Sequence, residues 1–315
     1  MTGVATTVRH FTRVTDLTRR ELERLPELAR DLKREPARYE CALHGRTVAC
    51  IFEKPSTRTR VSFAAAAAEL GATPVALSPQ ELQIGRGETI ADTARSLSGY
   101  CAAIVIRTYA QETVDELAAW ASVPVVNALS DEHHPCQALA DLLTIQEARG
   151  GLEGRRLAFV GNGGDNVAHS LLEAGALSGL DVALACPSEY GPKPEILEEA
   201  QRLADSSGAK LTVSEDPRKA VTAADAVYAD VWASMGEEAE HDMRAQVLGP
   251  YEVTEELMAL ARPDAIFLHC LPAKRGEEVE SAVIDGPQSA VWAQSGNRMP
   301  TEAALLLALT HGFEG

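Results

Sequence analysis

The stretch Thr47-Val-Ala-Cys-Ile-Phe52-Glu-Lys-Pro-Ser56-Thr57-Arg58-Thr59-Arg60 decides how this chain folds. Its first six residues form an apolar run with the length of a buried strand, and the Ala-rich residues 61–70 that follow are typical of a helix. Ser56 and Thr57 therefore fall where a helix N-cap belongs. A strand that passes through a polar turn into a helix is the repeating unit of α/β proteins.

The turn in this stretch brings two hydroxyl groups and two guanidinium groups to the start of the helix. A helix start offers unpaired backbone N–H groups and the positive end of the helix dipole, and arginine can place two donors on two phosphate oxygens. The turn therefore predicts a site for a multiply charged oxyanion. The alternative is that Ser56 or Thr57 only caps the helix while Arg58 and Arg60 form surface ion pairs.

Strands and helices alternate along the rest of the chain. Thr18-Arg19-Arg20-Glu21 is a capping box that opens a first helix, expected to end near Arg34. Beyond it we expect strands at residues 47–52, 73–77, 102–107, 123–127, 156–160, 182–186, 210–213, 226–231 and 265–270. We expect helices at residues 61–70, 90–100, 114–121, 138–148 and 167–177, and a terminal helix that begins at Pro300.

This alternation predicts an α/β fold of two Rossmann-like domains with parallel sheets, joined by interdomain helices. A length of 315 residues agrees with two domains. We expect the first at residues 1–148 and the second at residues 149–299. The terminal helix, residues 300–315, is expected to pack back on the first domain.

Composition excludes several classes of function. The net charge of -17 and pI near 4.9 argue against nucleic-acid binding, which needs clustered Lys and Arg. The N-terminus lacks the apolar segment of a signal peptide, and the apolar runs are too short to span a membrane. The six cysteines are dispersed without a C-x-x-C motif and indicate reduced thiols. We therefore expect a cytoplasmic protein that binds small molecules.

In parallel sheets the functional side chains gather at the carboxyl ends of the strands. Arg58, Arg107 and residues 127–137 all follow such ends, and residues 78–88, which include Gly85 and Gly87, are expected to form a mobile loop. The Gly-rich turn at residues 161–166 does not match a dinucleotide fingerprint, because its last position is Asn166 and no acidic residue ends the next strand. We interpret it as a ligand-facing loop and expect no cofactor.

A zinc site is the alternative use of the histidines and cysteines. His133, His134, Cys136, His269 and Cys270 could be assembled into one. The adjacent pairs His133-His134 and His269-Cys270 lack the usual spacing of zinc ligands, so we predict no metal.

Three stretches carry a resemblance to a known family: Ser56-Thr57-Arg58-Thr59-Arg60, His134-Pro135-Cys136-Gln137 and His269-Cys270-Leu271-Pro272. In this order and at these separations they resemble the carbamoyltransferase family. With Asp230-Val-Trp-Ala-Ser234-Met235-Gly236 added, the chain is most similar to its ornithine branch. The aspartate branch carries Pro where Cys270 stands and lacks Ser234-Met235-Gly236. The similarity runs from about His10 to the C-terminal helix.

The resemblance implies that a carbamoyl group passes from carbamoyl phosphate to L-ornithine, giving L-citrulline and phosphate in arginine biosynthesis. It implies that Arg58, Arg107, His134, Cys270 and Arg298 are catalytic. The implied carbamoyl phosphate site consists of Ser56, Thr57, Arg58, Thr59, Gln83, Arg107, His134, Gln137, Cys270, Leu271 and Arg298. Asn166, Asp230, Ser234 and Met235 would hold ornithine, with Asp230 facing its α-amino group.

The resemblance also implies a homotrimer, in which the loop with Gln83 and Arg86 reaches a neighbouring subunit's site. The chain departs from the family near its end. Family members usually carry Glu-Asn-Arg-Leu-His and then Gln-Lys, where this chain has Gly296-Asn297-Arg298-Met299-Pro300 and then Glu302-Ala303. Glu237 also replaces a usual Gln. These changes leave open whether the acceptor is ornithine, an ornithine analogue, putrescine or lysine.

Two other classes of function remain as alternatives. One is a carbamoyl phosphate-binding paralogue without catalysis, which would bind a bisubstrate analogue and form no citrulline. The other is a nicotinamide-dependent oxidoreductase, which would bind NADH.

Overall fold

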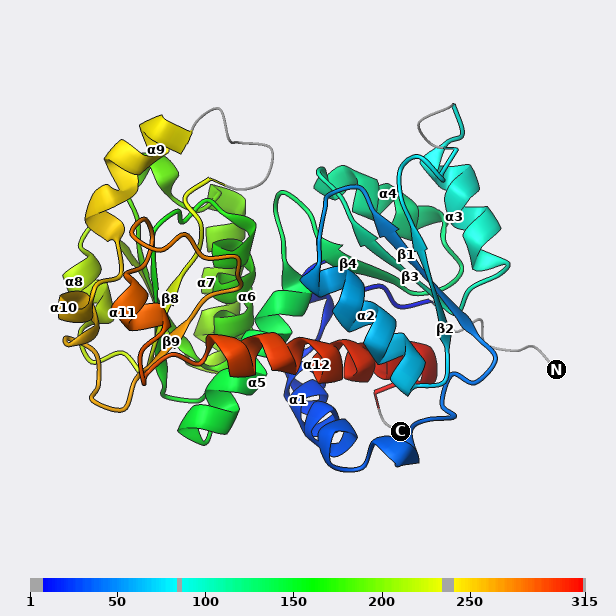
Figure 1. Cartoon of the computed structure of the whole chain (residues 1–315), viewed down its shortest axis with the longest axis horizontal. Coiled ribbons are helices and arrows are strands. Elements are labelled where there is room, and N and C mark those ends of the chain that lie inside the picture. The colour runs from blue at the N-terminus through cyan, green and yellow to red at the C-terminus, as the bar shows by residue number, and fades with distance from the viewer. Residues whose placement is uncertain (1–7, 84–86, 234–240, 314–315) are drawn as a thin grey trace. The chain divides into compact units, whose positions relative to one another are not determined.

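The computed structural model describes residues 8–83, 87–233 and 241–313. The chain divides into two compact units (Figure 1). The first unit contains residues 1–17, 24–136 and 299–315, and the second contains residues 18–23 and 137–298. Three long helices contribute residues to both units: α1 (Arg19–Arg34), α5 (Pro135–Arg149) and α12 (Val291–His311).

The first unit is built on a parallel four-stranded sheet in the order β2-β1-β3-β4. Its strands are β1 (Thr47–Phe52), β2 (Thr73–Leu77), β3 (Ala103–Arg107) and β4 (Val125–Leu129). The residues of β3 and β4 are all buried, which explains why these segments are apolar runs rather than alternating patterns.

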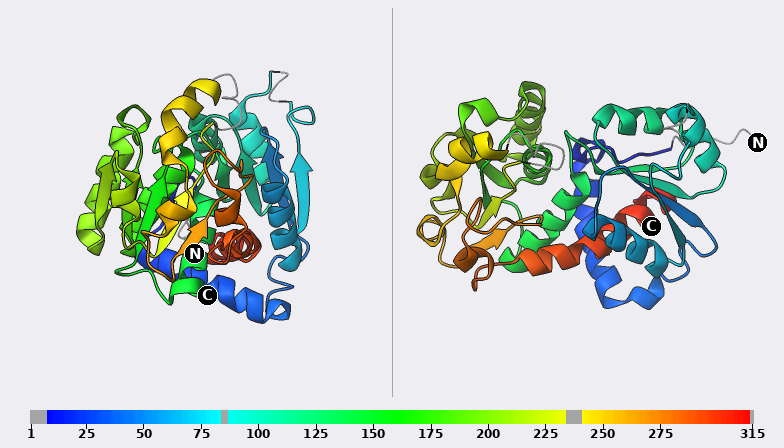
Figure 2. Two further views of the ribbon diagram at one scale, coloured as in Figure 1. Left: turned by 60° about the vertical axis from the view of Figure 1, so that its left-hand side comes forward. Right: turned by 45° about the horizontal axis from the view of Figure 1, so that its top comes forward.

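Helices cover both faces of this sheet (Figure 2). Helices α3 (Ile90–Ser98) and α4 (Gln111–Trp120) pack together on one face, and α2 (Arg58–Glu69) packs on the other against β1 and β2. The capping box before α1 is confirmed, because the backbone N–H of Thr18 donates to Glu21 at 2.8 Å and that of Glu21 donates to Thr18 at 3.3 Å. Short 3-10 helices lie at Val14–Asp16 and Pro36–Arg38.

The second unit is built on a parallel five-stranded sheet in the order β7-β6-β5-β8-β9. Its strands are β5 (Arg156–Val160), β6 (Asp181–Ala185), β7 (Leu211–Ser214), β8 (Ala226–Ala229) and β9 (Ile266–Leu268). The two parallel sheets with interleaved helices confirm the predicted α/β fold of two Rossmann-like domains.

Helices again cover both faces of this sheet. Helices α6 (Asn166–Ser178) and α7 (Pro194–Ser207) pack together on one face, and α8 (Pro217–Val221), α10 (Glu255–Met258) and α11 (Ser281–Ile284) lie on the other (Figure 1). Helix α9 (His241–Leu248) and the 3-10 helices Ser188–Tyr190 and Gly249–Tyr251 complete the unit. The sequence analysis did not predict α7 to α11.

The predicted start of the terminal helix at Pro300 is wrong. Helix α12 begins nine residues earlier, at Val291, and passes through Pro300. Proline removes one helical hydrogen bond, but a long helix that is buried around the proline can tolerate that loss. Gln294 and Leu305, on either side of Pro300, are both fully buried.

The strands predicted at 47–52, 73–77 and 156–160 have the predicted ends, whereas the strands predicted at 226–231 and 265–270 run two residues past the observed ends. Strand β8 ends at Ala229, and the N–H of Val231 then bonds to the side chain of Asp230 at 2.8 Å. Strand β9 ends at Leu268, because the N–H of His269 donates to the side chain of Gln294 at 2.9 Å. In both cases a side chain accepts the hydrogen bond of the backbone N–H that would have continued the strand.

Candidate active site

The predicted oxyanion turn connects β1 to α2 at the carboxyl edge of the first sheet. The Oγ of Ser56 accepts from the N–H of Thr59 at 3.1 Å, so Ser56 caps α2, and the Thr57 side chain is not used as a cap. The Oγ1 of Thr59 accepts from Nη1 of Arg107 at 3.5 Å. Arg107 is buried and lies opposite Phe52 in the β1–β3 register. The structure thus brings Ser56, Thr59 and Arg107 together.

The two arginines of the turn have different surroundings. Arg58, the first residue of α2, is half-buried, whereas Arg60 is exposed and its guanidinium lies 4.7 Å from the centre of the Phe52 ring. Residues two apart on a helix point in different directions, so the two guanidinium groups of the turn do not share one set of surroundings. A cation that sequence reasoning missed is Lys54, which is buried with its Nζ 4.6 Å from the centre of the Tyr109 ring.

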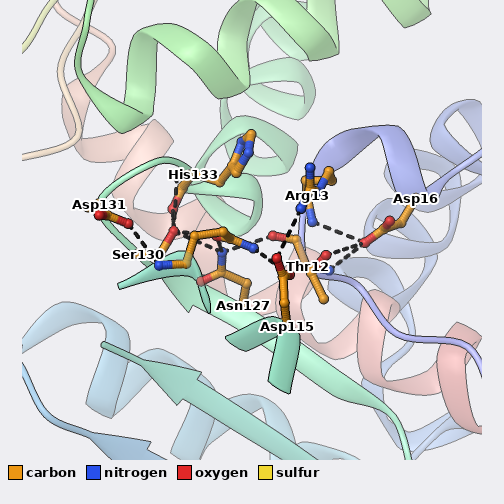
Figure 3. Close-up of polar contacts among 9 residues, drawn as sticks. Thr12, Arg13, Asp16, Asp115, Asn127, Ser130, Asp131 and His133 are labelled. Atoms are coloured by element: carbon orange, nitrogen blue, oxygen red, sulfur yellow. Dashed lines mark hydrogen bonds and ion pairs between the residues drawn. The ribbon is translucent and has the colours of Figure 1, made fainter. Parts of the chain in front are cut away.

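A buried polar network supports the end of β4 (Figure 3). Asn127 is fully buried, and its Nδ2 donates to the carbonyl oxygen of Thr12 at 2.9 Å and to Oε1 of Gln111 at 3.1 Å. The Oγ of Ser130 donates to the same Oε1 at 2.5 Å and accepts from the N–H of His133 at 3.1 Å. These bonds fix the turn that leads into α5.

His134 is the last residue before α5 and is 4% exposed. On its C-terminal side, the thiol of Cys136 donates to the carbonyl oxygen of Asn127 at 3.3 Å. His134 therefore lies between the hydrogen-bonded turn that follows β4 and the first turn of α5, which the Cys136 bond holds in place.

In the second unit, Gln137 and Arg298 form a buried pair. The Nη1 of Arg298 donates to Oε1 of Gln137 at 2.9 Å, and both residues are at most 3% exposed. The neighbouring Asn297 donates from Nδ2 to Oγ1 of Thr144 at 3.0 Å and to Oε2 of Glu147 at 2.9 Å. Asn297 therefore links α12 to α5 by hydrogen bonds. These bonds fix the backbone position from which the Arg298 side chain extends.

Cys270 and Asp230 follow β9 and β8, two adjacent strands. The thiol of Cys270 donates to Oδ1 of Asp230 at 3.0 Å. Burial raises the pKa of Asp230 and, helped by the charge of Asp230, raises the pKa of the Cys270 thiol well above its usual range. Cys270 is therefore a neutral hydrogen-bond donor and is unsuited to act as a thiolate nucleophile.

Leu271 has a φ of 61°, a left-handed conformation that strains a residue with a branched side chain. Its N–H donates to Nδ1 of His269 at 2.9 Å, and Nε2 of His269 lies 3.0 Å from Oε1 of the fully buried Glu278. Since Nδ1 accepts, the proton of His269 is on Nε2 and points to Glu278. This chain of bonds holds the strained turn in place.

Asn166 is the first residue of α6 and is buried beside the Gly-rich turn. A Cβ at Gly163 would lie 2.8 Å from Sγ of Cys186, so the turn packs against the end of β6. Gln83 is exposed. Ser234, Met235, Glu237 and the loop residues Gly85 and Arg86 lie outside the described residues.

Among the described residues, one group has the composition of a metal site. Asp230, His269 and Cys270 each bring a ligand atom within 4.8 Å of the others. A metal ion would have to displace a hydrogen bond from His269, whose two ring nitrogens face Leu271 and Glu278, and to ionise a thiol of raised pKa. These residues do not fit a resident metal ion, and our prediction of no metal stays a prediction.

The sequence of each half of the chain matches a family model. The carbamoyl-P binding domain of aspartate/ornithine carbamoyltransferase matches residues 9–147, and the Asp/Orn binding domain of the same enzymes matches residues 153–309. The chain belongs to the aspartate/ornithine carbamoyltransferase family. It is therefore a carbamoyltransferase, as its motifs predicted.

Individual carbamoyltransferases resemble it over nearly their whole length. The ornithine carbamoyltransferase of Anoxybacillus flavithermus is 51% identical, with 95% of this chain and 96% of the relative covered. The structure of the Pyrococcus furiosus ornithine carbamoyltransferase has a TM-score of 0.92 and 47% identity, covering 97% of this chain and 98% of that one. The anabolic ornithine carbamoyltransferase of Campylobacter jejuni has a TM-score of 0.90 and 37% identity, covering 96% and 98%.

Gly296, where the chain departs from the carbamoyltransferase pattern, has room for a side chain. A Cβ built at Gly296 meets no other atom within 4 Å. Asn297 and Arg298, which this chain shares with the pattern, are both buried and hydrogen-bonded. The missing carboxylate therefore leaves the Gln137–Arg298 pair intact.

Proposed function

We propose that this carbamoyltransferase acts on L-ornithine, so that carbamoyl phosphate and L-ornithine give L-citrulline and phosphate. The observation that carries the proposal is the group of Ser56, Thr59 and Arg107 at the carboxyl edge of the first sheet. A helix start with hydroxyl and guanidinium donors suits a phosphate. The ornithine carbamoyltransferases that resemble the whole chain support the choice of acceptor.

The first unit supplies the donors for the phosphate and for the carbamoyl oxygen. We assign residues 1–148 to a carbamoyl phosphate-binding domain that also includes residues 300–315. In this proposal Ser56, Thr57, Arg58 and Thr59 bind the phosphate, with Gln83 as a further contact. Arg107 bridges the phosphate and the carbonyl oxygen, and His134 donates to that oxygen.

We assign residues 149–299 to an amino-acid domain, and propose the following roles for Gln137 and for residues of this domain. Gln137 orients the carbamoyl amide, and Cys270, Leu271 and Arg298 complete its surroundings. Asn166, Asp230, Ser234 and Met235 bind ornithine. The buried side chain of Asp230, which follows β8, faces the α-amino group, whose positive charge would compensate a buried carboxylate.

The reaction needs donors where charge develops. A neutral amine attacks the carbonyl carbon, negative charge grows on the carbonyl oxygen, and phosphate leaves. Arg58, Arg107 and His134 would stabilise that oxygen, and removal of one well-placed donor typically costs about 3–4 kcal/mol of transition-state stabilisation. The departing phosphate can take the proton of the amine, so no side-chain base and no covalent intermediate are required.

The δ-amine of ornithine must lose its proton before it attacks. Activity at subsaturating ornithine should therefore rise with pH toward mildly alkaline values, because the neutral amine is the reactive form. Measured kcat/KM for ornithine between pH 6 and 9 tests this step. A flat profile would contradict it.

An acceptor panel tests the proposed function. Purified protein is mixed with carbamoyl phosphate and one of ornithine, putrescine, lysine, N-acetylornithine or aspartate, and the ureido product is measured. We expect ornithine to give the highest kcat/KM. A different preferred amine would replace ornithine as the acceptor, and binding of a bisubstrate analogue without product would favour the non-catalytic alternative.

We further propose a cytoplasmic homotrimer that serves arginine biosynthesis. The similar anabolic enzyme of Campylobacter jejuni supports the biosynthetic direction. Among the helices within residues 8–83, 87–233 and 241–313, none combines the length and apolar character that crossing a membrane requires. Light scattering of the purified protein should give three times the chain mass of 33.6 kDa.

A further inference from the structure

Asp141 is a buried carboxyl group of the second unit that accepts hydrogen bonds from two glutamine side chains. It is fully buried on α5, one helical turn after Gln137. Its Oδ1 accepts from Nε2 of Gln137 at 2.7 Å and from Nε2 of Gln294 at 2.7 Å. One carboxylate oxygen therefore receives two side-chain amides, from α5 and from α12.

The partners of Gln137 determine which way its amide points. The Oδ1 of Asp141 accepts hydrogen bonds whether the carboxyl group is ionised or carries a proton on Oδ2, and a guanidinium can only donate them. With Asp141 on one side and Arg298 on the other, Nε2 of Gln137 must face Asp141 and Oε1 must face Arg298. The opposite orientation would set two donors against each other at Arg298 and two acceptors at Asp141.

Gln294 connects the same carboxylate to the turn after β9. Its Nε2 also donates to the hydroxyl of Tyr228 at 3.1 Å, and its Oε1 accepts from the backbone N–H of His269 at 2.9 Å. Because Asp141 requires the donor end of Gln294, the acceptor end is left for His269. Asp141 thereby fixes the backbone just before Cys270 and Leu271.

We infer that Asp141 is a positioning residue that keeps the carbonyl oxygen of Gln137 turned toward the carbamoyl amide of the substrate. The inference rests on the proposed function, in which Gln137 orients that amide. The oxygen of Gln137 has two lone pairs, so it can accept from the substrate NH₂ while it still accepts from Arg298. Asp141 itself touches no substrate.

Burial is costly for this carboxyl group. Removal from water raises the pKa of Asp141 to about 7, although the two glutamines, Tyr228 and Arg298 all act to lower it. An apolar side chain of the same size would avoid this cost if the position served packing alone. The acceptor oxygen therefore has a use beyond filling space.

Two ligands separate orientation of the amide from binding of the phosphate. Phosphonoacetamide carries the amide and a phosphonate, with a methylene in place of the bridging oxygen of carbamoyl phosphate, and inorganic phosphate carries no amide. Dissociation constants for both are measured by calorimetry on the full-length protein. Asp141→Leu removes the acceptor at similar volume, whereas Asp141→Asn keeps an oxygen that can accept from Gln137.

We expect Asp141→Leu to weaken phosphonoacetamide binding about tenfold or more, since one lost hydrogen bond in a buried site can have that effect. Phosphate binding should change less than about twofold, and Asp141→Asn should restore most of the affinity for phosphonoacetamide. Asp285→Asn is the control, because the Asp285 carboxylate belongs to the same unit but accepts from Arg275 on the surface. It should leave both constants unchanged.

Three outcomes would overturn the inference: unchanged phosphonoacetamide binding in Asp141→Leu, an equal loss for both ligands, or an Asp141→Asn protein as weak as Asp141→Leu. If the Leu variant does not fold, the crystal structure of the wild type with phosphonoacetamide decides. Gln137 should keep its Nε2 on Asp141 and present Oε1 to the ligand amide, and a Gln137 rotated away would refute the inference. Wild-type protein that forms no citrulline would instead contradict the proposed function.

Discussion

The guanidinium of Arg298 donates to the side-chain oxygen of Gln137 at 2.9 Å, although the two residues are 161 positions apart in the sequence. Both side chains are buried, and each belongs to a helix that contributes residues to both units. The pair connects the start of α5 to the middle of α12. A hydrogen bond between a charged donor and a buried amide is among the stronger kinds in proteins.

Replacement of Arg298 should therefore impair catalysis. We expect Arg298→Met to lower kcat/KM by about 10²–10³, the typical effect of losing one preorganised donor. The kcat/KM of Arg298→Lys should lie between those of Arg298→Met and the wild type, because lysine keeps the charge but cannot present two donors in one plane as a guanidinium does. Arg275→Met is the control, since Arg275 pairs with Asp285 on the surface. Steady-state kinetics of the three variants check the prediction, and an Arg298→Met protein with normal kcat/KM would contradict it.

The two arginines of the β1–α2 turn should differ in their effect on activity. Arg58→Ala should remove most activity while the protein stays folded, because Arg58 would face the phosphate. Arg60→Ala should retain activity within about threefold, since the Arg60 guanidinium lies over the Phe52 ring and its loss removes about 0.5–1 kcal/mol of stability. Kinetics and circular dichroism of both variants test this pair. Equal loss of activity in both would show that Arg60 also binds substrate.

The sequence predicted the elements whose signal is local. The apolar run of β1, the capping box before α1 and the alternation of strands and helices each depend on neighbouring residues, and each agrees with the structure. Family motifs supplied the candidate residues of the site, and the structure groups Ser56 with Thr59 and Arg107, Gln137 with Arg298, and Asp230 with Cys270.

The features that the sequence did not predict depend on contacts between distant residues. Asp141 and Gln294 look like ordinary polar positions of two helices, and only the fold shows that Asp141 accepts hydrogen bonds from both Gln294 and Gln137. The ends of β8 and β9 are set by the side chains of Asp230 and Gln294, which a local pattern cannot reveal. The predicted helix start at Pro300 was wrong for the same reason, because packing keeps α12 helical through this proline.

Gly296 offers a stability test that does not depend on catalysis. It lies inside α12, and a side chain there would meet no other atom within 4 Å. Glycine in a helix interior is less favourable than alanine by about 0.5–1 kcal/mol. We therefore expect Gly296→Ala to raise the free energy of unfolding by about that amount, measured by urea denaturation. A destabilised variant would mean that the backbone at Gly296 needs conformations that alanine disfavours.

Asp141 should make the stability of the protein depend on pH. Burial raises the pKa of Asp141 from its usual 3.8 to about 7 in the folded state, where Tyr228, Arg298 and the thiol of Cys270 are the neighbouring titratable groups. Between these two pKa values the folded state keeps a proton that the unfolded state has lost. The free energy of unfolding should therefore fall as pH rises through this window, with a limit of about 1.4 kcal/mol per pH unit.

The Asp141→Asn variant isolates this effect, because asparagine does not titrate. The difference in unfolding free energy, wild type minus variant, should decrease from pH 5 to pH 6.5 at close to 1.4 kcal/mol per pH unit and level off above pH 7, where both states of the wild type are ionised. Urea denaturation of both proteins at half-unit pH intervals gives this difference directly, because other titrating groups contribute equally to both proteins and cancel. A difference that stays constant over the range would mean that Asp141 is ionised in the folded protein already at pH 5, so that Gln137, Gln294 and Arg298 stabilise the charge more than burial penalises it.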